Sequence, residues 1–148
     1  MIRIMFVCRG NICRSPMAEF ILRDMVKKQG REKDFVIASC ATSTEEIWGD
    51  RGNPVYPPAK AELAKHGISC DGKYAVQLKK SDYDRYDLFF CMDYNNVRNA
   101  ISILGGDVAG KVRKLLLNRD VQDPWYSGNF EVTYKDIYEG CKVIMEKY

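Results

Sequence analysis

The sequence contains a single histidine, His66, and no second closely spaced pair of cysteine or histidine residues follows Cys8 and Cys13. Structural zinc sites usually draw four such ligands from closely spaced pairs. We therefore expect no metal site, and no other motif indicates a cofactor.

The sequence also lacks a long apolar run and an excess of charge. No stretch approaches the roughly 20 apolar residues of a membrane-spanning helix, and the segment from Met1 to Val7 has no secretory pattern of basic, apolar and small residues. With 23 Lys and Arg against 20 Asp and Glu, the net charge is only +3, which is too weak to indicate a nucleic-acid partner. We expect neither a membrane nor a nucleic-acid partner, and a cytoplasmic location.

What the sequence does have is an ordinary globular composition and six dispersed cysteines. Of its 148 residues, 46% are hydrophobic and 29% are charged, which is typical of a chain that folds around its own core. The length predicts a single domain over residues 1–148. A chain of this size needs no disulfide framework, so we expect free thiols at Cys8, Cys13, Cys40, Cys70, Cys91 and Cys141.

Short apolar runs alternate with segments of helical periodicity along the chain. A strand is predicted from Ile2 to Val7, ending at Cys8, and a helix that Ser15 caps is predicted to run from Pro16 to Gly30. The β-α order predicts an α/β fold of three layers, with a parallel sheet of about four strands and helices on both faces. Further strands are expected at 35–39, 87–92 and 111–117, and further helices at 57–67, 94–106 and 132–148.

Two longer segments, 40–56 and 118–130, interrupt this alternation. Both are rich in Gly, Pro, Asp and aromatic residues. Ligands of open α/β sheets bind beyond the carboxyl ends of the strands, where Cys8 and the beginnings of these segments are expected. We therefore expect the two segments to form walls of a site around Cys8.

The segment CRGNICRS joins the first predicted strand to the first predicted helix. Backbone N–H groups at a helix N-terminus lack helical partners, so a tight loop there can surround a phosphate group. Gly10 and Asn11 tolerate the backbone that such a loop needs, and the Arg14 guanidinium matches two phosphate oxygens. We expect phosphate to bind to Arg9, Gly10, Asn11, Ile12, Cys13, Arg14 and Ser15.

The positive field of such a loop also favours the thiolate form of a cysteine, which is its nucleophilic form. A hydrogen bond from Ser15 would stabilise a thiolate at Cys8. Taken singly, each residue equally fits a buried cysteine at a strand end followed by a capped helix. The combination of a cysteine, an arginine six residues later, a Gly-Asn pair and a Ser-Pro helix start favours the phosphate site.

Two stretches, VCRGNICRSPMAEF and VQDPWY, resemble signatures of the low-molecular-weight protein tyrosine phosphatases. The resemblance covers the whole chain and includes ATSTEEIWG, KHGI and LFFCMD. It implies the Rossmann-like fold of that family and hydrolysis of phosphotyrosine or small aryl phosphates through a phosphocysteine. It also implies a phosphoprotein or phosphopeptide substrate, inorganic phosphate as product, no cofactor, and a monomer or weak dimer. The implied roles are nucleophile for Cys8, phosphate binding for Arg14, general acid for Asp123, and loop support for Asn11, Ser15 and Ser39.

Asp123 also has a chemical rationale. A carboxylic acid near the pocket mouth can protonate the leaving oxygen and then deprotonate the water that attacks phosphocysteine. Without the Cys8 loop, Asp-Pro followed by Trp-Tyr would indicate only a turn. With that loop, the acid role is favoured. For Asp93, at the expected end of the third strand, steadying the phosphate loop and capping the strand end are both open.

Three aromatic residues are candidate walls for a phosphotyrosine ring, because aromatic rings stack and exclude water. We favour this role over partial core packing for Trp125 and Tyr126, whereas Trp48 equally fits a loop anchor. Cys13 is a candidate redox partner that would form a disulfide with Cys8 and spare it from further oxidation. Small-residue packing under the loop is an equal alternative for Cys13.

The chain departs from the family pattern at several positions. Lys73 and Val76 stand where many eukaryotic relatives have His and Arg, so a histidine link behind the loop is absent or rebuilt. Glu45 stands where an aromatic residue often lies, which affects the wall geometry and substrate preference. His66, next to Gly67, is expected to end a helix rather than to catalyse.

Other activities of the same fold fit less well. Thioredoxin-linked arsenate reductases need a further cysteine pair, but Cys70 and Cys91 are far apart in the sequence. Protein-arginine phosphatases typically have Thr at the position of Ile12 and lack the aromatic pair after Asp-Pro. A phosphopeptide-binding module without turnover would not need a cysteine nucleophile, a phosphate-binding arginine and an acid together.

Overall fold

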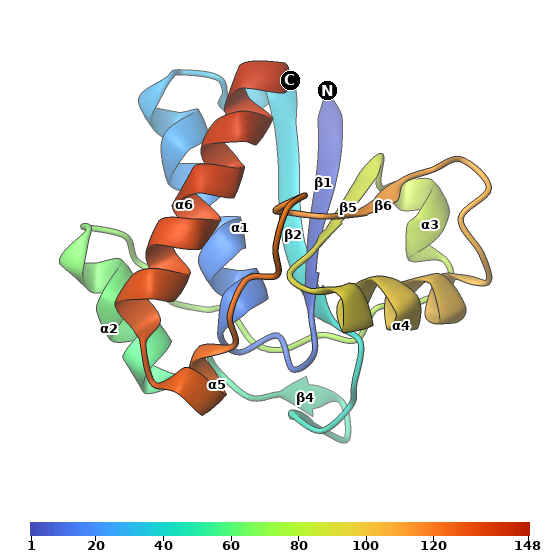
Figure 1. Cartoon of the computed structure of the whole chain (residues 1–148), viewed down its shortest axis with the longest axis horizontal. Coiled ribbons are helices and arrows are strands. Elements are labelled where there is room, and N and C mark those ends of the chain that lie inside the picture. Colours follow the sequence, from blue (N-terminus) through green and yellow to red (C-terminus); the bar gives the residue numbers. More distant parts are fainter.

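The computed structural model describes all 148 residues. Four strands form one parallel sheet in the order β2-β1-β5-β6, and Figure 1 shows helices on either side of it. The predicted α/β fold with a four-stranded parallel sheet is confirmed. The strands of this sheet are β1 (Ile2–Cys8), β2 (Phe35–Ala41), β5 (Leu88–Cys91) and β6 (Val112–Lys114).

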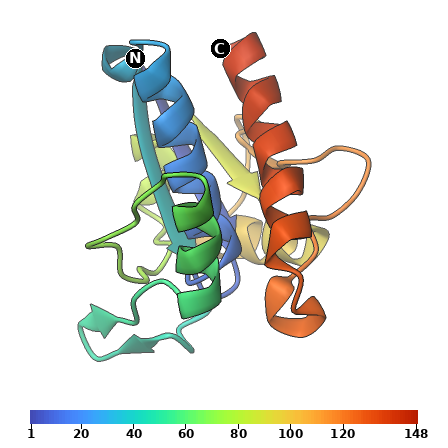
Figure 2. The same ribbon diagram turned by 90° about the vertical axis from the view of Figure 1, so that its left-hand side faces the viewer.

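The helices form one layer on each face of the sheet (Figures 1 and 2). One layer contains α1 (Arg14–Lys28), α2 (Pro57–Lys65) and α6 (Phe130–Lys147), and the other contains α3 (Asp82–Arg85) and α4 (Tyr94–Leu104). None of the helices combines the length and apolarity needed to cross a membrane. The remaining elements are a 3₁₀ turn at Glu32–Asp34, the two-residue strands β3 (Ile47–Trp48) and β4 (Arg51–Gly52), and the single turn α5 (Pro124–Ser127).

The side chains of β1 divide between two cores. Ile4, Phe6 and Cys8 belong to the larger core beneath α1 and α6, whereas Met5 and Val7 belong to the smaller core beside α4. Successive side chains of a strand point to opposite faces, so a strand covered on both faces is apolar throughout. This burial explains why the first strand was recognisable as a continuous apolar run.

The strand order places the end of β1 at a change of direction in the topology. The chain passes from β1 to β2 on one side and later returns to β5 and β6 on the other. Ligand sites of open α/β sheets occur where the crossovers diverge in this way. The loop after β1, the β3-β4 hairpin and α5 all gather at this end of the sheet, at the bottom of Figure 1.

Some predicted boundaries differ from the structure. The last strand was expected at 111–117, but β6 ends at Lys114. Leu115 and Leu116 both belong to the larger core, and successive strand residues cannot face the same core. The first helix begins at Arg14 rather than Pro16, so the N-cap position is Cys13 and Ser15 does not cap the helix. The Ser15 hydroxyl contacts the sulfur of Cys8 instead. The closing helix begins at Phe130, capped by Asn129, which accepts a hydrogen bond from Val132 N.

Candidate active site

The loop after β1 turns sharply between the last residue of the strand, Cys8, and the first residue of α1, Arg14. Asn11 has a φ of 59° and is the one non-glycine residue with a positive φ. A left-handed backbone is tolerated by few residues other than glycine, and asparagine is one of them. At Gly10, by contrast, a Cβ atom would lie 3.2 Å from Glu46 Cγ. Gly10 therefore lets the neighbouring segment approach the loop, while Asn11 makes the turn.

The sulfur of Cys8 is held by two polar groups of this loop and helix. Ser15 Oγ lies 2.9 Å from Cys8 Sγ, and the backbone N–H of Asn11 donates to the same sulfur at 3.3 Å. Asn11 Nδ2 donates to Ser15 Oγ at 2.7 Å, so the proton of the Ser15 hydroxyl can point at the sulfur, with the carbonyl of Cys40 at 3.4 Å as the more distant acceptor. Both donors stabilise negative charge on Cys8, and Cys8 itself is only 3% exposed.

The side-chain amide of Asn11 has hydrogen-bond partners for both its nitrogen and its oxygen. Its Nδ2 donates to Ser39 Oγ at 3.0 Å as well as to Ser15, and its Oδ1 accepts from the backbone N–H of Val76 at 3.0 Å. The side chain of Val76 is half exposed and takes no part in this contact. The structure therefore brings together the three expected support residues, and residue 76 supplies its backbone alone.

A charged cluster of Glu19, Lys73 and Arg23 lies behind these support residues. The sequence did not predict Glu19 as part of the site. Ser39 Oγ donates to Glu19 Oε1 at 2.6 Å. Lys73 Nζ donates to the carbonyl of Ser39 at 2.9 Å and lies 3.5 Å from Glu19 Oε1, while Arg23 Nη2 lies 2.9 Å from Glu19 Oε2. The link expected to be absent or rebuilt is thus rebuilt around Lys73. The spacing of Glu19 could have indicated it, because Glu19 follows Ser15 by four residues and therefore lies on the same face of the helix.

Lys73→Met is expected to destabilise the protein, because the Glu19 carboxylate, 4% exposed, would keep only the half-exposed Arg23 as a cation. Breaking a buried charge pair costs about 3–5 kcal/mol, and the remaining partner reduces this to about 1–3 kcal/mol here. The free energy of unfolding in urea measures the loss. Lys73→Arg should keep most of the stability. Adding Glu19→Gln to Lys73→Met should recover part of it, and no loss in Lys73→Met would contradict this account.

Arg14 is oriented by three oxygen atoms at the ends of other elements. Its Nη1 donates to Asp93 Oδ2 at 2.8 Å and to the carbonyl of Val121 at 3.0 Å, and its Nη2 lies 3.6 Å from Asp123 Oδ2. Burial alone would lower the pKa of this guanidinium, but the negative charges of Cys8, Asp93 and Asp123 outweigh it and raise the pKa. Arg14 is therefore a fixed cation with its planar fork held in one orientation.

Asp93 contacts Arg14 of the phosphate loop, and it caps the helix α4 rather than the end of a strand. Its Oδ2 accepts from Arg14, and its Oδ1 accepts from the backbone N–H of Asn96 at 2.7 Å, which caps α4. The helix cap and the positioning of Arg14 use different oxygen atoms of one carboxylate. The contact with the phosphate loop was among the expected roles, whereas the helix cap was not predicted.

Asp123 is the N-cap of α5. Its Oδ1 accepts from the backbone N–H of Trp125 at 3.0 Å, which leaves Oδ2 facing Arg14. The side chain is 28% exposed. It lines a cavity of about 280 Å³ together with ten other residues: Cys8, Arg9, Gly10, Ile12, Cys13, Arg14, Glu45, Glu46, Trp125 and Tyr126.

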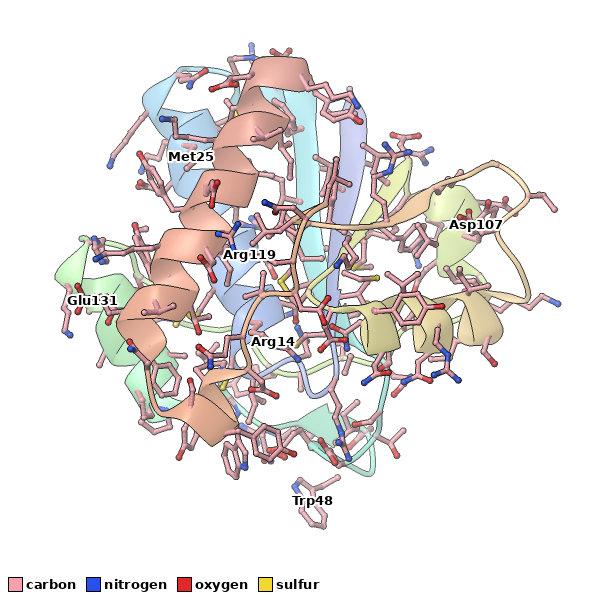
Figure 3. The ribbon with its side chains drawn as sticks, viewed as in Figure 1. Arg14, Met25, Trp48, Asp107, Arg119 and Glu131 are labelled. Atoms are coloured by element: carbon pink, nitrogen blue, oxygen red, sulfur yellow. The ribbon has the colours of Figure 1, made fainter.

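Two of the three candidate aromatic walls line the cavity, and both also face solvent, Trp125 with 55% and Tyr126 with 76% of its surface exposed. The Trp125 ring packs on Tyr56 with 4.9 Å between ring centroids. Trp48 does not line it: its side chain is 70% exposed on the β3-β4 hairpin, and Figure 3 shows it projecting into solvent, away from Arg14. The expected wall from Trp48 is corrected, because the two-residue strands of the hairpin turn that side chain outward and Glu45 and Glu46 face the cavity instead.

Cys13 is the second thiol at the cavity. It is 6% exposed, and burial raises the pKa of its thiol to about 12. All six cysteines are free.

His66 ends α2, with its ring stacked on Tyr134 at 3.7 Å between ring centroids and its Nε2 3.1 Å from Glu62 Oε2. Its place is a helix terminus, as expected.

Comparisons with known proteins agree with this geometry. A sequence profile described as low molecular weight phosphotyrosine protein phosphatase matches residues 3–148. The low molecular weight protein-tyrosine-phosphatase YfkJ of Bacillus subtilis is 37% identical, over 98% of this chain and 94% of its own.

Solved structures extend the likeness. The structure of SP-PTP, a low molecular weight protein tyrosine phosphatase from Streptococcus pyogenes, matches with a TM-score of 0.89 and 33% identity, over 99% of this chain and 93% of the other. A structure of the YwlE arginine phosphatase matches with a TM-score of 0.82 over 99% of this chain and 95% of the other. At 22% identity, the YwlE match is a likeness of fold alone. The profile and the close relatives are decisive: this chain belongs to the low molecular weight phosphotyrosine protein phosphatases and is an enzyme of that class.

Proposed function

We propose that this protein hydrolyses phosphotyrosine in proteins or peptides, and small aryl phosphates, through a phosphocysteine at Cys8. The observation that supports this most is the arrangement of one cavity. Cys8, with two donors on its sulfur, shares that cavity with Arg14 and with Asp123, whose Oδ2 faces Arg14. A nucleophile, a cation for the phosphate and an acid for the leaving group are the parts that such a reaction requires.

In the first half-reaction, the Cys8 thiolate attacks phosphorus and the bond between phosphorus and the tyrosine oxygen breaks. Asp123 enters this step protonated and gives its proton to the departing oxygen. Arg14 and the N–H groups of the loop stabilise the charge on the non-bridging phosphate oxygens. The products are free tyrosine hydroxyl and a phosphoryl group on Cys8.

In the second half-reaction, the Asp123 carboxylate takes a proton from water, whose oxygen attacks phosphorus. The sulfur–phosphorus bond breaks and the electron pair returns to Cys8. Ser15 and the backbone N–H of Asn11 stabilise that thiolate as a leaving group. Inorganic phosphate is released, and Asp123 is protonated again for the next cycle.

Asp123→Asn is expected to lower kcat by roughly 10²–10⁴-fold, the range for loss of a general acid or base. The loss should be smaller for aryl phosphates whose leaving group needs little protonation. The measurement is kcat over a series of aryl phosphates of different leaving-group pKa, for both forms of the enzyme. Asparagine keeps an oxygen for the Trp125 N–H, so the α5 cap should survive.

The pattern across leaving groups decides the role of Asp123. If good and poor leaving groups suffer equally, Asp123 positions Arg14 or α5 and is not the proton donor. Asp120→Asn is a matched control, since Asp120 does not line the cavity and contacts Lys114 and the backbone N–H of Tyr94 at the start of α4. That variant should keep the wild-type dependence on the leaving group.

The walls of the cavity favour an aryl substrate. A phosphate at the loop is reached by the long, flat phosphotyrosine side chain, whereas phosphoserine is too short to reach Cys8 while its backbone stays outside. Trp125 and Tyr126 line the cavity, which supports their role as walls for that ring. Ile12 offers no hydroxyl to a phosphoguanidinium, so we expect phosphoarginine to be a poor substrate.

Changing Trp125 and Tyr126 together to Ala is expected to raise KM selectively for phosphotyrosine peptides. The penalty should be about 1–3 kcal/mol, the range for lost packing around one aromatic ring. The comparison is kcat/KM for phosphotyrosine, phosphoserine and phosphoarginine peptides, with wild type strongly preferring phosphotyrosine. A wild-type preference for phosphoarginine would make this an arginine phosphatase and would reverse the roles given to Ile12 and to the aromatic walls.

Further features support the wider proposal. We place the whole of residues 1–148 in one phosphatase domain in the cytoplasm, where its six free thiols would stay reduced. Cys13 lines the same cavity as Cys8 and is proposed to pair with it on oxidation. The arsenate reductase alternative lacks support, since Cys91 is fully buried in β5 and cannot serve as a mobile thiol.

A further inference from the structure

A second hollow of about 440 Å³ adjoins the active-site cavity. The two share four residues, Arg9, Arg14, Asp123 and Tyr126. The second hollow extends from them between the segment after β2 and the first turns of α4, and Tyr126 is its one hydrophobic residue. The others that line it are Thr42, Ser43, Asp93, Asn95, Asn96 and Asn99.

Arg9 stands at the junction of the two cavities. Its guanidinium contacts Glu45 alone, with Nε 3.1 Å from Oε1 and Nη2 3.2 Å from Oε2. Both side chains are about half exposed, at 60% and 49%, and exposed ion pairs contribute little to stability because water screens them. A carboxylate from another molecule can therefore replace Glu45 on Arg9 at small cost.

The α4 side of the hollow carries polar groups without internal partners. Asn95 and Asn99 are four residues apart on α4, so they lie on one face of that helix. Neither side chain forms a hydrogen bond within the protein, unlike Asn96, which bonds to the backbone N–H of Asp93. Their amide groups are available as donors to whatever enters the hollow.

The charges around the hollow favour an anionic occupant over a cationic one. Its two carboxylates, Asp93 and Asp123, both face Arg14, at 2.8 and 3.6 Å. In the first half-reaction Asp123 carries a proton and no charge. Arg9 is then the one charged group of the hollow whose ion-pair partner, Glu45, another carboxylate can easily replace.

We propose that this hollow binds the side chain of an Asp or Glu residue of the substrate close to its phosphotyrosine. Arg9 is the cation for that carboxylate, and Asn95 and Asn99 donate to it. The assignment rests on the proposed function, because the phosphotyrosine must occupy the neighbouring cavity. It adds a preference for acidic sequences around the phosphorylated residue.

The test is kcat/KM on phosphotyrosine peptides of alanine background that carry Glu, Gln or Lys at each position within three residues of the phosphotyrosine. At one or more positions, wild type should prefer Glu over Lys by about 2- to 5-fold, as expected for a partly exposed ion pair. Arg9→Gln should bring this ratio close to one, while Arg9→Lys should keep part of it. Glu45→Gln should raise the ratio by freeing Arg9.

The double variant Asn95→Leu, Asn99→Leu provides the matched control. It should lower the Glu preference but leave kcat/KM for p-nitrophenyl phosphate unchanged, since that small substrate does not reach the hollow. A wild-type ratio near one at every position, or an unchanged ratio in Arg9→Gln, would overturn the assignment. Absence of turnover on p-nitrophenyl phosphate and on the all-alanine peptide would instead count against the proposed function.

Discussion

Cys8→Ser is expected to abolish turnover of phosphotyrosine peptides while phosphate analogues still bind. The donors from Ser15 and Asn11 that stabilise a thiolate do not ionise a serine hydroxyl at neutral pH, and removal of a nucleophile typically costs about 10⁴-fold or more in kcat. The binding groups of the loop and Arg14 are unchanged in this variant. Steady-state kcat and the affinity for vanadate or phosphate, measured on the same preparation, separate the two effects.

Cys13→Ser is the matched control for this prediction. It makes the same chemical change five residues along the same buried loop, but at a thiol whose pKa burial raises to about 12 and which therefore stays protonated. Under reducing conditions it should lose less than about tenfold in kcat, because no bond to phosphorus forms there. Substantial multiple turnover by pure Cys8→Ser would show that Cys8 is not the nucleophile. So would a loss of kcat in Cys13→Ser that is greater than the loss in Cys8→Ser.

Arg14→Lys is expected to lower kcat/KM by roughly 10³-fold, near the upper end of the range for loss of one preorganised donor to a charged transition state. Arginine presents its donors in a rigid plane, whereas lysine is a single flexible point charge. The guanidinium already bonds to Asp93 and to the carbonyl of Val121. One ammonium group cannot keep those two contacts and also hold two phosphate oxygens. Measuring kcat/KM on p-nitrophenyl phosphate avoids contributions from peptide binding.

A control separates this loss from a change in fold. Arg23→Lys makes the same substitution on the same helix at an exposed position, where the ion pair with Glu19 can be kept by a lysine. It should keep nearly wild-type kcat/KM. If Arg14→Lys had near-normal kinetics, a planar fork would not be needed and Arg14 would not bind the phosphate as described.

The part of the site that the sequence predicted is local. Cys8, Asn11, Arg14 and Ser15 lie within eight consecutive residues, so their spacing and the strand-to-helix change define their arrangement almost completely. The backbone turn at Asn11 follows from residue type alone. Fold class was predictable for a similar reason, because the regular alternation of apolar runs and helical segments permits few topologies.

The parts that escaped prediction depend on contacts between distant segments. Lys73 meets Glu19 from 54 residues away in the sequence, and no local pattern connects them. Trp48 was a candidate wall because aromatic rings stack and exclude water, with a loop anchor as the equal alternative, yet the β3-β4 hairpin turns its side chain outward. The charged wall of Glu45 and Glu46 replaces it, which only the path of the backbone could show.

The most direct test of the account is to trap the covalent intermediate. Wild type and Asp123→Asn are mixed with a phosphotyrosine peptide, quenched with acid during turnover, digested and analysed by mass spectrometry. The account predicts one phosphoryl group on the peptide that contains Cys8, bound through sulfur, and more of it in Asp123→Asn if the lost base slows hydrolysis more than the lost acid slows formation. Continued release of phosphate with no phosphoryl group on Cys8 in either form would contradict it and would indicate direct attack by water.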